Sequence, residues 1–297
     1  KLLDIIKKSF NKCKNLENLK IPQTISVFGT YCCYRNYNES ALRIENVSIE
    51  SLNSYAFYSY YSYSQNQKKG VVIIDTVDWY VKNDASSACK QALYRTEINQ
   101  LNIHSVSNGN SYSDYTHFQI TGIENVTIDN GITSIPKYFF NHALIRNVTI
   151  PNSVTDLYEN SLNAGYFNVN NIGDNINTLG YYSMSSPKFV TDVNFDKLTF
   201  KNEYGINYAQ YEKKLDLSRN TSGGSTLYLK QLLYSFRSCA ELILPTRALE
   251  YDYYSSSSKV AKLSIPSMAN FCASTFSNSG SPAAYAQTLY TKDLITD

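Results

Sequence analysis

The chain has 297 residues, of which 43% are hydrophobic and 18% are charged, and its formal net charge is +2. This composition is typical of a globular chain and excludes an intrinsically disordered one. The near-neutral charge gives no reason to expect nucleic acid or an anionic membrane as a partner. No apolar run approaches the roughly 20 residues of a spanning helix, so we expect no membrane insertion in this segment.

A short motif, apolar-x-x-apolar-x-apolar, recurs along the chain from its start. It occurs as LENLKIP at 16–22 and IENVSIE at 44–50, and in weaker form as VVIID at 71–75 and LNI at 101–103. Its alternation predicts a β-strand, and a following Pro or Asn is a turn signal. The last apolar positions of the eleven predicted strands are Ile21, Ile49, Ile73, Ile103, Ile128, Ile150, Ile172, Phe195, Leu217, Leu244 and Ile265.

The best-matched repeats lie in the centre of the chain. IENVTIDNGITSIPKYFFNHA at 123–143 aligns with IRNVTIPNSVTDLYENSLNAG at 145–165, and apolar positions coincide at an offset of 22 residues. A third unit extends the match to 184, although Asn170 stands where an inward aliphatic is expected. One such unit cannot bury its apolar face alone, so neighbouring units stack around a continuous core. Strands at equivalent places then pair in parallel along one face.

Two of these segments resemble the BspA-like, treponemal-type leucine-rich repeats. They are FNKCKNLENLKIPQTI at 10–25 and IRNVTIPNSVTDLYENSL at 145–162, against a family pattern of Phe-x-x-Cys-x-x-Leu-x-x-Ile-x-Ile-Pro. Cys13 falls at the family's Cys position, and Cys239 comes close to it with a shorter spacer. The resemblance implies a right-handed leucine-rich-repeat solenoid. It would have a curved parallel β-sheet on its concave face and irregular or short helical segments on its convex face.

The repeat pattern also predicts the domain limits. The matched pairs Leu2 with Val154, Ile5 with Leu157, Phe10 with Leu162 and Cys13 with Gly165 indicate that the chain opens in the second half of a repeat. A solenoid end needs a polar cap, so we expect the natural protein to continue upstream. Residues 1–276 form the predicted repeat domain, with a truncated first repeat. Residues 277–297 leave the pattern and are predicted to be a C-terminal cap or a linker.

Alternation of side chains predicts polar ladders on the concave face of the sheet. The predicted outward residues are Asn18, Lys20, Asn46, Ser48, Asn125, Thr127, Asn147 and Thr149. Such a face suits a sugar or a polar protein surface, and it equally fits small polar residues that merely cover a tightly curved sheet. The chain also carries Asn-x-Ser/Thr acceptors, which matter only in a eukaryotic secretory protein. They are Asn38, Asn46, Asn125, Asn147 and Asn220.

Tyrosine is unusually frequent, at 27 residues. Many tyrosines lie in insertions rich in Tyr and Ser, and the candidate binding residues there are Tyr58, Tyr60, Tyr61, Tyr63, Tyr251, Tyr253 and Tyr254. Tyrosine gives contact area at low entropic cost, which suits adaptable binding surfaces. The alternative is that tyrosine is simply a good strand and surface residue.

The sequence contains no recognised catalytic motif: no Gly-x-Ser-x-Gly elbow, phosphate loop, GxGxxG or HExxH. A nucleophile and base formed by Cys89 with His104, or by Cys32 and Cys33 with a histidine, has no support in the spacing. The six cysteines fit no zinc pattern, and we expect them to be reduced and buried. We therefore expect no enzyme, no cofactor and no metal site.

Three further features have simple structural interpretations. Asp75 and Asp78 beside Trp79 fit a turn next to a core aromatic residue, or alternatively a sugar-binding cleft. His117 and His142 are predicted to be surface or turn residues.

The family resemblance implies a recognition module at the cell surface or outside the cell. Such repeats are typical of surface proteins of host-associated bacteria and some parasitic protists, where adhesion is the usual role. The expected partner is a protein or glycan on a host or neighbouring cell surface, bound by a monomer. Two alternatives stay open: a passive structural spacer, and a carbohydrate-binding appendage of a larger protein.

Overall fold

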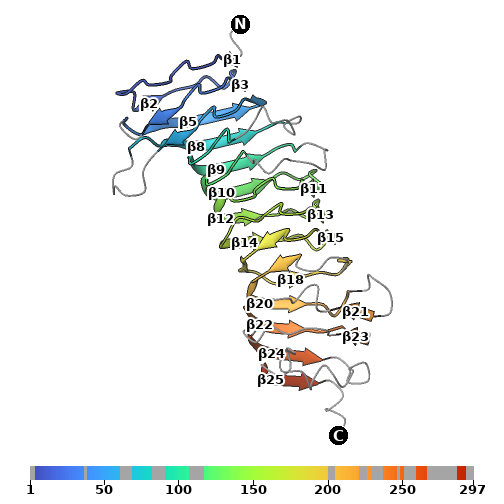
Figure 1. Cartoon of the computed structure of the whole chain (residues 1–297). Coiled ribbons are helices and arrows are strands. Elements are labelled where there is room, and N and C mark those ends of the chain that lie inside the picture. Colours follow the sequence, from blue (N-terminus) through green and yellow to red (C-terminus); the bar gives the residue numbers. More distant parts are fainter. Residues whose placement is uncertain are drawn as a thin grey trace. The chain divides into compact units, whose positions relative to one another are not determined.

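The computed structural model describes residues 4–36, 39–60, 69–81, 91–106, 117–199, 205–220, 226–228, 237–245, 248–250, 259–265 and 286–291. It divides into two compact units. Unit 1 comprises 1–148 and 163–165, and unit 2 comprises 149–162 and 166–297. Each unit is a stack of coils whose long strands lie side by side (Figure 1).

The long strands of unit 1 form a sheet in the order β2-β5-β8-β9-β10-β12. Their bounds are β2 Asn18–Leu19, β5 Leu42–Ile49, β8 Val72–Trp79, β9 Glu97–Ile103, β10 Gly122–Ile128 and β12 Leu144–Thr149. Consecutive strands from β2 to β10 pair in parallel. In β5 the apolar residues Leu42, Ile44, Val47 and Ile49 are buried, and the residues between them face outward. The repeated apolar motif is therefore the buried face of this sheet.

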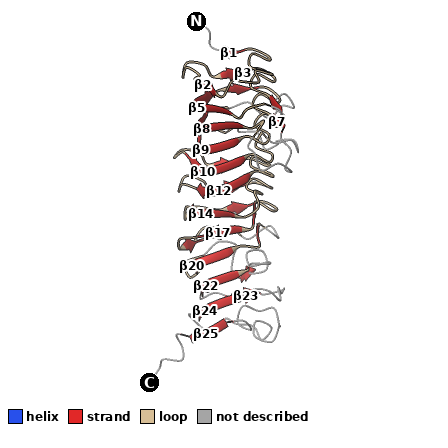
Figure 2. Cartoon of the chain, turned by 90° about the vertical axis from the view of Figure 1, so that its left-hand side faces the viewer, coloured by secondary structure: helices blue, strands red, loops and turns tan. Residues whose placement is uncertain are grey.

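Short strands occupy the return half of each coil in unit 1. Their bounds are β1 Asp4–Ile5, β3 Val27–Phe28, β4 Arg35–Asn36, β6 Ser51–Leu52, β7 Ser59–Tyr60 and β11 Ser134–Ile135. The parallel sets are β1-β3-β6 and β4-β7. Throughout the described ranges the elements are strands and turns without a helix (Figure 2), so the predicted helical segments are absent there. The same residues contain no helix that is long and apolar enough to cross a membrane.

Unit 2 repeats the same design with shorter strands. Its sheet runs β14-β17-β20-β22-β24-β25, and β18 also pairs with β20. The bounds are β14 Phe167–Asn171, β17 Pro187–Phe189, β18 Val193–Asn194, β20 Gln210–Asp216, β22 Ser238–Ile243, β24 Lys259–Ile265 and β25 Ala286–Thr291. The short strands are β13 Asp156–Leu157, β15 Thr178–Leu179, β16 Met184–Ser185, β19 Ile206–Asn207, β21 Thr226–Tyr228 and β23 Ala248–Glu250. Within residues 277–297, β25 pairs in parallel with β24.

Aromatic rings fill the core of unit 1. Phe118 is fully buried, with ring centroids 5.0 Å from Trp79, 5.7 Å from Phe139 and 5.3 Å from Phe140. His117 is also buried and lies 5.2 Å from the Trp79 ring. The prediction of a surface position for His117 is therefore wrong, although it does lie at a turn. Its ring packs beside the indole, so it contributes to the core.

The register of two strands differs from the prediction. Ile49 pairs with Trp79, so the last apolar position of β8 is Trp79 and not Ile73. Asp75 and Asp78 therefore lie within the strand instead of forming a turn. The misassignment arose because VVIID matches the motif by itself, whereas burial continues to Trp79, which is fully buried.

The pairing register of the first long strand, β2, also differs from the prediction. Asn18 pairs with Arg43, and the Lys20 ammonium lies 3.7 Å from the carboxylate of Glu45. Asn18 and Lys20 are exposed, but they do not continue rows from Asn46 and Ser48 as predicted. β2 has only two residues, and Pro22 follows shortly after it. Proline has no N–H to donate to the ladder, so the register there is set by few hydrogen bonds.

Candidate functional site: a tyrosine groove and a polar sheet face

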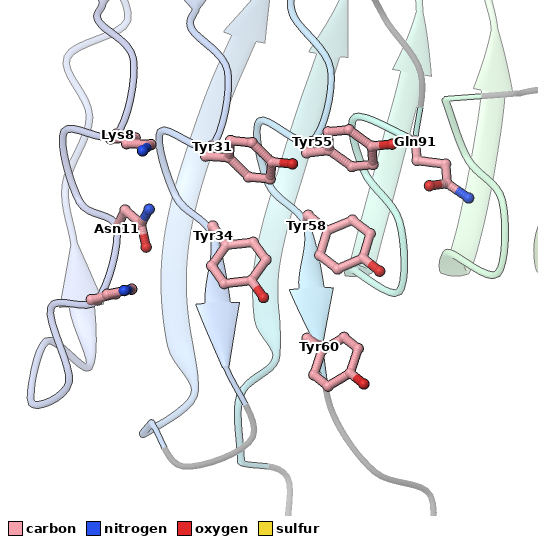
Figure 3. Close-up of a pocket in the computed structure, with 9 residues that line it drawn as sticks. Lys8, Asn11, Tyr31, Tyr34, Tyr55, Tyr58, Tyr60 and Gln91 are labelled. Atoms are coloured by element: carbon pink, nitrogen blue, oxygen red, sulfur yellow. The ribbon is translucent and has the colours of Figure 1, made fainter.

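A groove lined by tyrosines lies along the return segments of unit 1. It has a volume of about 550 Å³. The lining residues are Lys8, Asn11, Lys12, Tyr31, Tyr34, Tyr55, Tyr58, Tyr60 and Gln91. Figure 3 shows Tyr31 and Tyr55 in one row and Tyr34 and Tyr58 in a second row, each ring on a successive coil. We call this feature the tyrosine groove.

The local sequence explains why these rings face outward. Two buried residues, Cys32 and Cys33, separate Tyr31 from Tyr34, and the next coil has buried Ala56 and Phe57 between Tyr55 and Tyr58. A third coil follows the same pattern, with buried Ala92 and Leu93 between Gln91 and Tyr94. Because the two central residues fill the core, the first and fourth residues of each segment turn to solvent.

Backbone hydrogen bonds between coils hold the rings at a constant spacing. The Cys33 amide donates to the Ala56 carbonyl at 2.8 Å, and the Phe57 amide donates to the Ala92 carbonyl at 2.7 Å. Tyr31 and Tyr55 have left-handed φ angles of 57° and 59°. That conformation costs about 1–2 kcal/mol per L-residue, and the hydrogen bonds of neighbouring coils offset it.

The rings stack along each row. The centroid distance is 5.1 Å for Tyr31 and Tyr55 with planes 6° apart, and 5.6 Å for Tyr34 and Tyr58 with planes 11° apart. Tyr94 continues the second row, 4.8 Å from Tyr58. Such aromatic pairs contribute about 0.5–1.5 kcal/mol beyond area burial. The groove therefore has a preformed aromatic floor.

Burial raises the pKa of Tyr34 and of Tyr58, and neighbouring tyrosines add to the effect. Both phenols therefore remain protonated at physiological pH, and each can donate a hydrogen bond to a ligand.

A buried arginine fixes the segment after Tyr34. Arg35 is fully buried, and its guanidinium donates to the carbonyls of Cys13 at 2.6 Å and Leu16 at 2.5 Å. The buried carboxylate of Glu39 lies 3.4 Å away. These partners stabilise a charge that would otherwise be costly to bury. Because Arg35 directly follows Tyr34, its hydrogen bonds to Cys13 and Leu16 also hold the second row of rings against the first coil.

The predicted polar face of the long sheet is present in unit 1, but its rows are mixed. Asn46 pairs with Thr76, which pairs with Gln100, and Gln100 pairs with Asn125. The predicted polar ladder is therefore not made of asparagine alone, because Thr76 and Gln100 stand between Asn46 and Asn125. The amide of Asn147 does donate to the Asn125 side-chain oxygen at 3.1 Å.

The second predicted row is mixed in the same way, because Ser48 pairs with Asp78, Asp78 with Asn102 and Asn102 with Thr127. Thr149, at the end of β12, is partly buried. Thr76 and Asp78 enter the two rows because the register of β8 differs from the prediction, and Gln100 and Asn102 of β9 pair with them.

A histidine bridges two carboxylates at the end of this face. His104 Nε2 lies 3.2 Å from Asp78 Oδ1, and its Nδ1 lies 2.7 Å from Asp129 Oδ2. The ring of Tyr80 stacks on the imidazole at 4.4 Å. Partial burial would lower the pKa of His104, but hydrogen bonds to Asp129 and Asp78 outweigh it and raise the pKa above its ordinary value. Both ring nitrogens are thus engaged within the chain.

Four of the six cysteines lie in the described part of the chain. Cys13, Cys32, Cys33 and Cys239 are free thiols, and the latter three are buried as expected, whereas Cys13 is only partly buried. Cys239 lies in β22 opposite Tyr211, so it is an inward strand residue and not an equivalent of Cys13. Burial raises its pKa to about 12. The sequence hypothesis that paired Cys89 with His104 falls partly outside the described residues. Within the described ranges, no group of His, Cys, Asp and Glu is arranged to hold a metal.

The predicted site residues divide between described and undescribed parts of the chain. Tyr58 and Tyr60 line the tyrosine groove. Tyr61, Tyr63, Tyr251, Tyr253 and Tyr254 lie outside the described residues, as does the acceptor Asn38. Another acceptor, Asn220, is buried, and its amide donates to the Leu198 carbonyl at 3.1 Å, so a glycan would disrupt the core.

The sequence prediction missed Tyr31, Tyr34, Tyr55 and Tyr94. A signal was available, because Tyr31-x-x-Tyr34 recurs as Tyr55-x-x-Tyr58 after 24 residues.

The chain matches the model of a known repeat family. The family model described as BspA type leucine rich repeat region matches residues 1–75 and 86–217, in six copies. The match covers more than half of the chain. The chain belongs to this family.

The leucine-rich-repeat resemblance drawn from residues 10–25 and 145–162 is thereby confirmed. A crystal structure of a leucine rich cell surface protein from Faecalibacterium prausnitzii A2-165 is also similar, with 12% identity and a TM-score of 0.31 over 97% of this chain and 83% of that one. A comparison with curated protein sequences found no match.

Proposed function

We propose that this BspA-type repeat protein is a non-enzymatic recognition module that acts at the cell surface or outside the cell. The observation that carries the proposal is the tyrosine groove, an open site with aligned, partly exposed rings on a rigid repeat scaffold. Tyrosine offers large contact area with little side-chain entropy to lose on binding. Family membership supports a surface role, since such repeats are typical of surface proteins of host-associated organisms.

Binding is a better account than catalysis for the described residues. Cys32 and Cys33 are fully buried, and burial and the neighbouring Cys32 raise the pKa of Cys33. Both nitrogens of His104 already contact carboxylates. A catalytic nucleophile has to be accessible and lie within reach of its base, and these groups do not meet that requirement.

The proposal is tested by biolayer interferometry against immobilised host-matrix proteins, mucins and polysaccharides. A groove variant, Tyr34→Ser/Tyr58→Ser, is compared with a sheet-face variant, Asn46→Arg/Thr127→Arg, whose positions are both exposed. We expect binding to at least one class of ligand, lost in the groove variant and kept in the sheet-face variant. Circular dichroism checks that both variants fold.

The reverse outcome, binding lost only in the sheet-face variant, would move the site to the polar sheet. Absence of binding across the whole panel would contradict a recognition role and favour a passive spacer.

A further inference from the structure

We infer that the tyrosine groove binds the chain of an acidic polysaccharide, a polymer of sugar rings that carry carboxylates. This inference rests on the proposed recognition function and names its ligand class. It follows from three properties of the groove: a periodic aromatic floor, protonated hydroxyl and amide groups beside it, and cations without matching acids in its lining.

The floor of the groove is periodic, and this favours a periodic ligand. Equivalent rings recur on successive coils at 5.1 Å in one row and at 5.6 and 4.8 Å in the other. Their planes differ by at most 11°. Because the rings stack on one another, the part of each ring that the groove exposes recurs once per coil. The C–H groups on the flat side of a sugar ring can pack against these exposed aromatic parts. A polysaccharide presents one such side per residue along a line, whereas a folded protein surface has no such repeat.

Hydrogen-bonding groups flank the aromatic floor. Tyr34 and Tyr58 each present a phenolic O–H group, and burial raises the pKa of each further above its ordinary value. The side chains of Asn11 and Gln91 lie at opposite ends of the rows (Figure 3). Hydroxyls and carboxamides both donate and accept, which matches the many hydroxyl groups of a sugar chain. An apolar ligand would leave these groups without partners.

The charge of the lining favours an acidic chain over a neutral one. Lys8 and Lys12 are exposed at one end, and none of the nine described lining residues is acidic. Glu39 lies near Tyr34, but it is buried and faces Arg35. A carboxylate on the bound chain would therefore meet a positive potential at the end of the groove that Lys8 and Lys12 line.

Competing ligands fit the same features less well. A proline-rich helix is also periodic and docks on aromatic grooves, but its proline residues offer no carboxylate to Lys8 and Lys12 and no hydroxyl groups to the flanking hydrogen-bonding side chains. A neutral glycan would use the rings and leave the cations unused.

The test is isothermal titration calorimetry with polygalacturonate and with the same polymer fully methyl-esterified, which keeps the sugar ring and removes its charge. For the unmodified chain at low salt, we expect binding to polygalacturonate to be about tenfold tighter than to the ester, because two exposed ion pairs contribute modestly. The variant Lys8→Gln/Lys12→Gln should abolish that difference. The groove variant Tyr34→Ser/Tyr58→Ser should lose both polymers.

A matched control tests for simple cation exchange. Lys20→Gln/Arg43→Gln removes two exposed cations from the sheet side of the same unit, and we expect it to bind as the unmodified chain does. Equal weakening by this control and by Lys8→Gln/Lys12→Gln would overturn the inference, and so would equal affinity for the two polymers.

The same titration with an acidic, proline-rich peptide separates this inference from the proposed function. Groove-dependent binding of that peptide, with no binding of either polymer, would refute the polysaccharide and leave recognition standing. If neither the polymers nor any member of the wider panel binds, both proposals fail.

Discussion

At the residue scale, pairing between adjacent coils sets the contacts of Asp78 and Trp79. Trp79 is fully buried, as expected of a core aromatic residue. Their location in a strand followed only from pairing with Ser48 and Ile49. Asp78 thereby reaches His104, 26 residues later. A contact of this kind depends on which residues become neighbours in adjacent coils.

The His104 cluster predicts a pH-dependent contribution to stability. Because its pKa in the folded chain is raised above about 6.5, the charged ring stabilises the fold fully below the unfolded value. That contribution is lost as the pH rises through the folded pKa. We expect His104→Asn to lower the melting temperature more at pH 5.5 than at pH 8.5, as measured by circular dichroism.

The control is His142→Asn, which removes an exposed imidazole at a turn with φ of 59°, a conformation that Asn tolerates. A melting-temperature difference for His104→Asn that stays constant between pH 5.5 and 8.5 would contradict the charge argument.

At the element scale, the coils pack so closely that some turns admit only glycine. Gly180 follows β15, and a Cβ there would lie 2.6 Å from the carbonyl carbon of Tyr158 in the previous coil. Gly29 holds the corresponding place after β3, where a Cβ would lie 2.6 Å from the Lys7 amide nitrogen. Both glycine amides donate to a carbonyl of the preceding coil. Burial patterns in a sequence do not reveal this close backbone approach.

We therefore expect Gly180→Ala to destabilise unit 2 by about 1–3 kcal/mol, the usual cost of overpacking a close contact. Urea denaturation followed by circular dichroism gives the change in the unfolding midpoint. Gly122→Ala is the control, because the nearest atom to a Cβ there is 4.0 Å away. Equal midpoints for the two variants would show that the coils separate easily.

At the scale of the whole molecule, repeat architecture predicts that a destabilising substitution affects mainly the coils around it. Each coil contacts mainly its neighbours, so stability is approximately a sum of coil and interface contributions. Phe118 lies in the aromatic core of unit 1, among Trp79, Phe139 and Phe140. Phe118→Ala should cost about 3–5 kcal/mol, and the cost should fall on that unit.

Hydrogen exchange measures this directly. We expect amides of β9 and β10 to lose protection in Phe118→Ala, whereas amides of β20 and β22 keep theirs. A uniform loss of protection across both units would mean that the chain unfolds as one cooperative block.

The sequence by itself determined the repeat family, the parallel pairing and most inward positions. The reason is local: alternation of apolar residues at a fixed period marks the buried face of each strand, as in Ile123, Val126 and Ile128.

Only the tertiary structure decided which outward residues meet. Tyr34, Tyr58 and Tyr94 are separated by 24 and then 36 residues, yet their rings align because inter-coil hydrogen bonds fix the spacing whatever the length of the intervening loop. Loops absorb added residues at small entropic cost, so a fixed sequence offset cannot predict such a site.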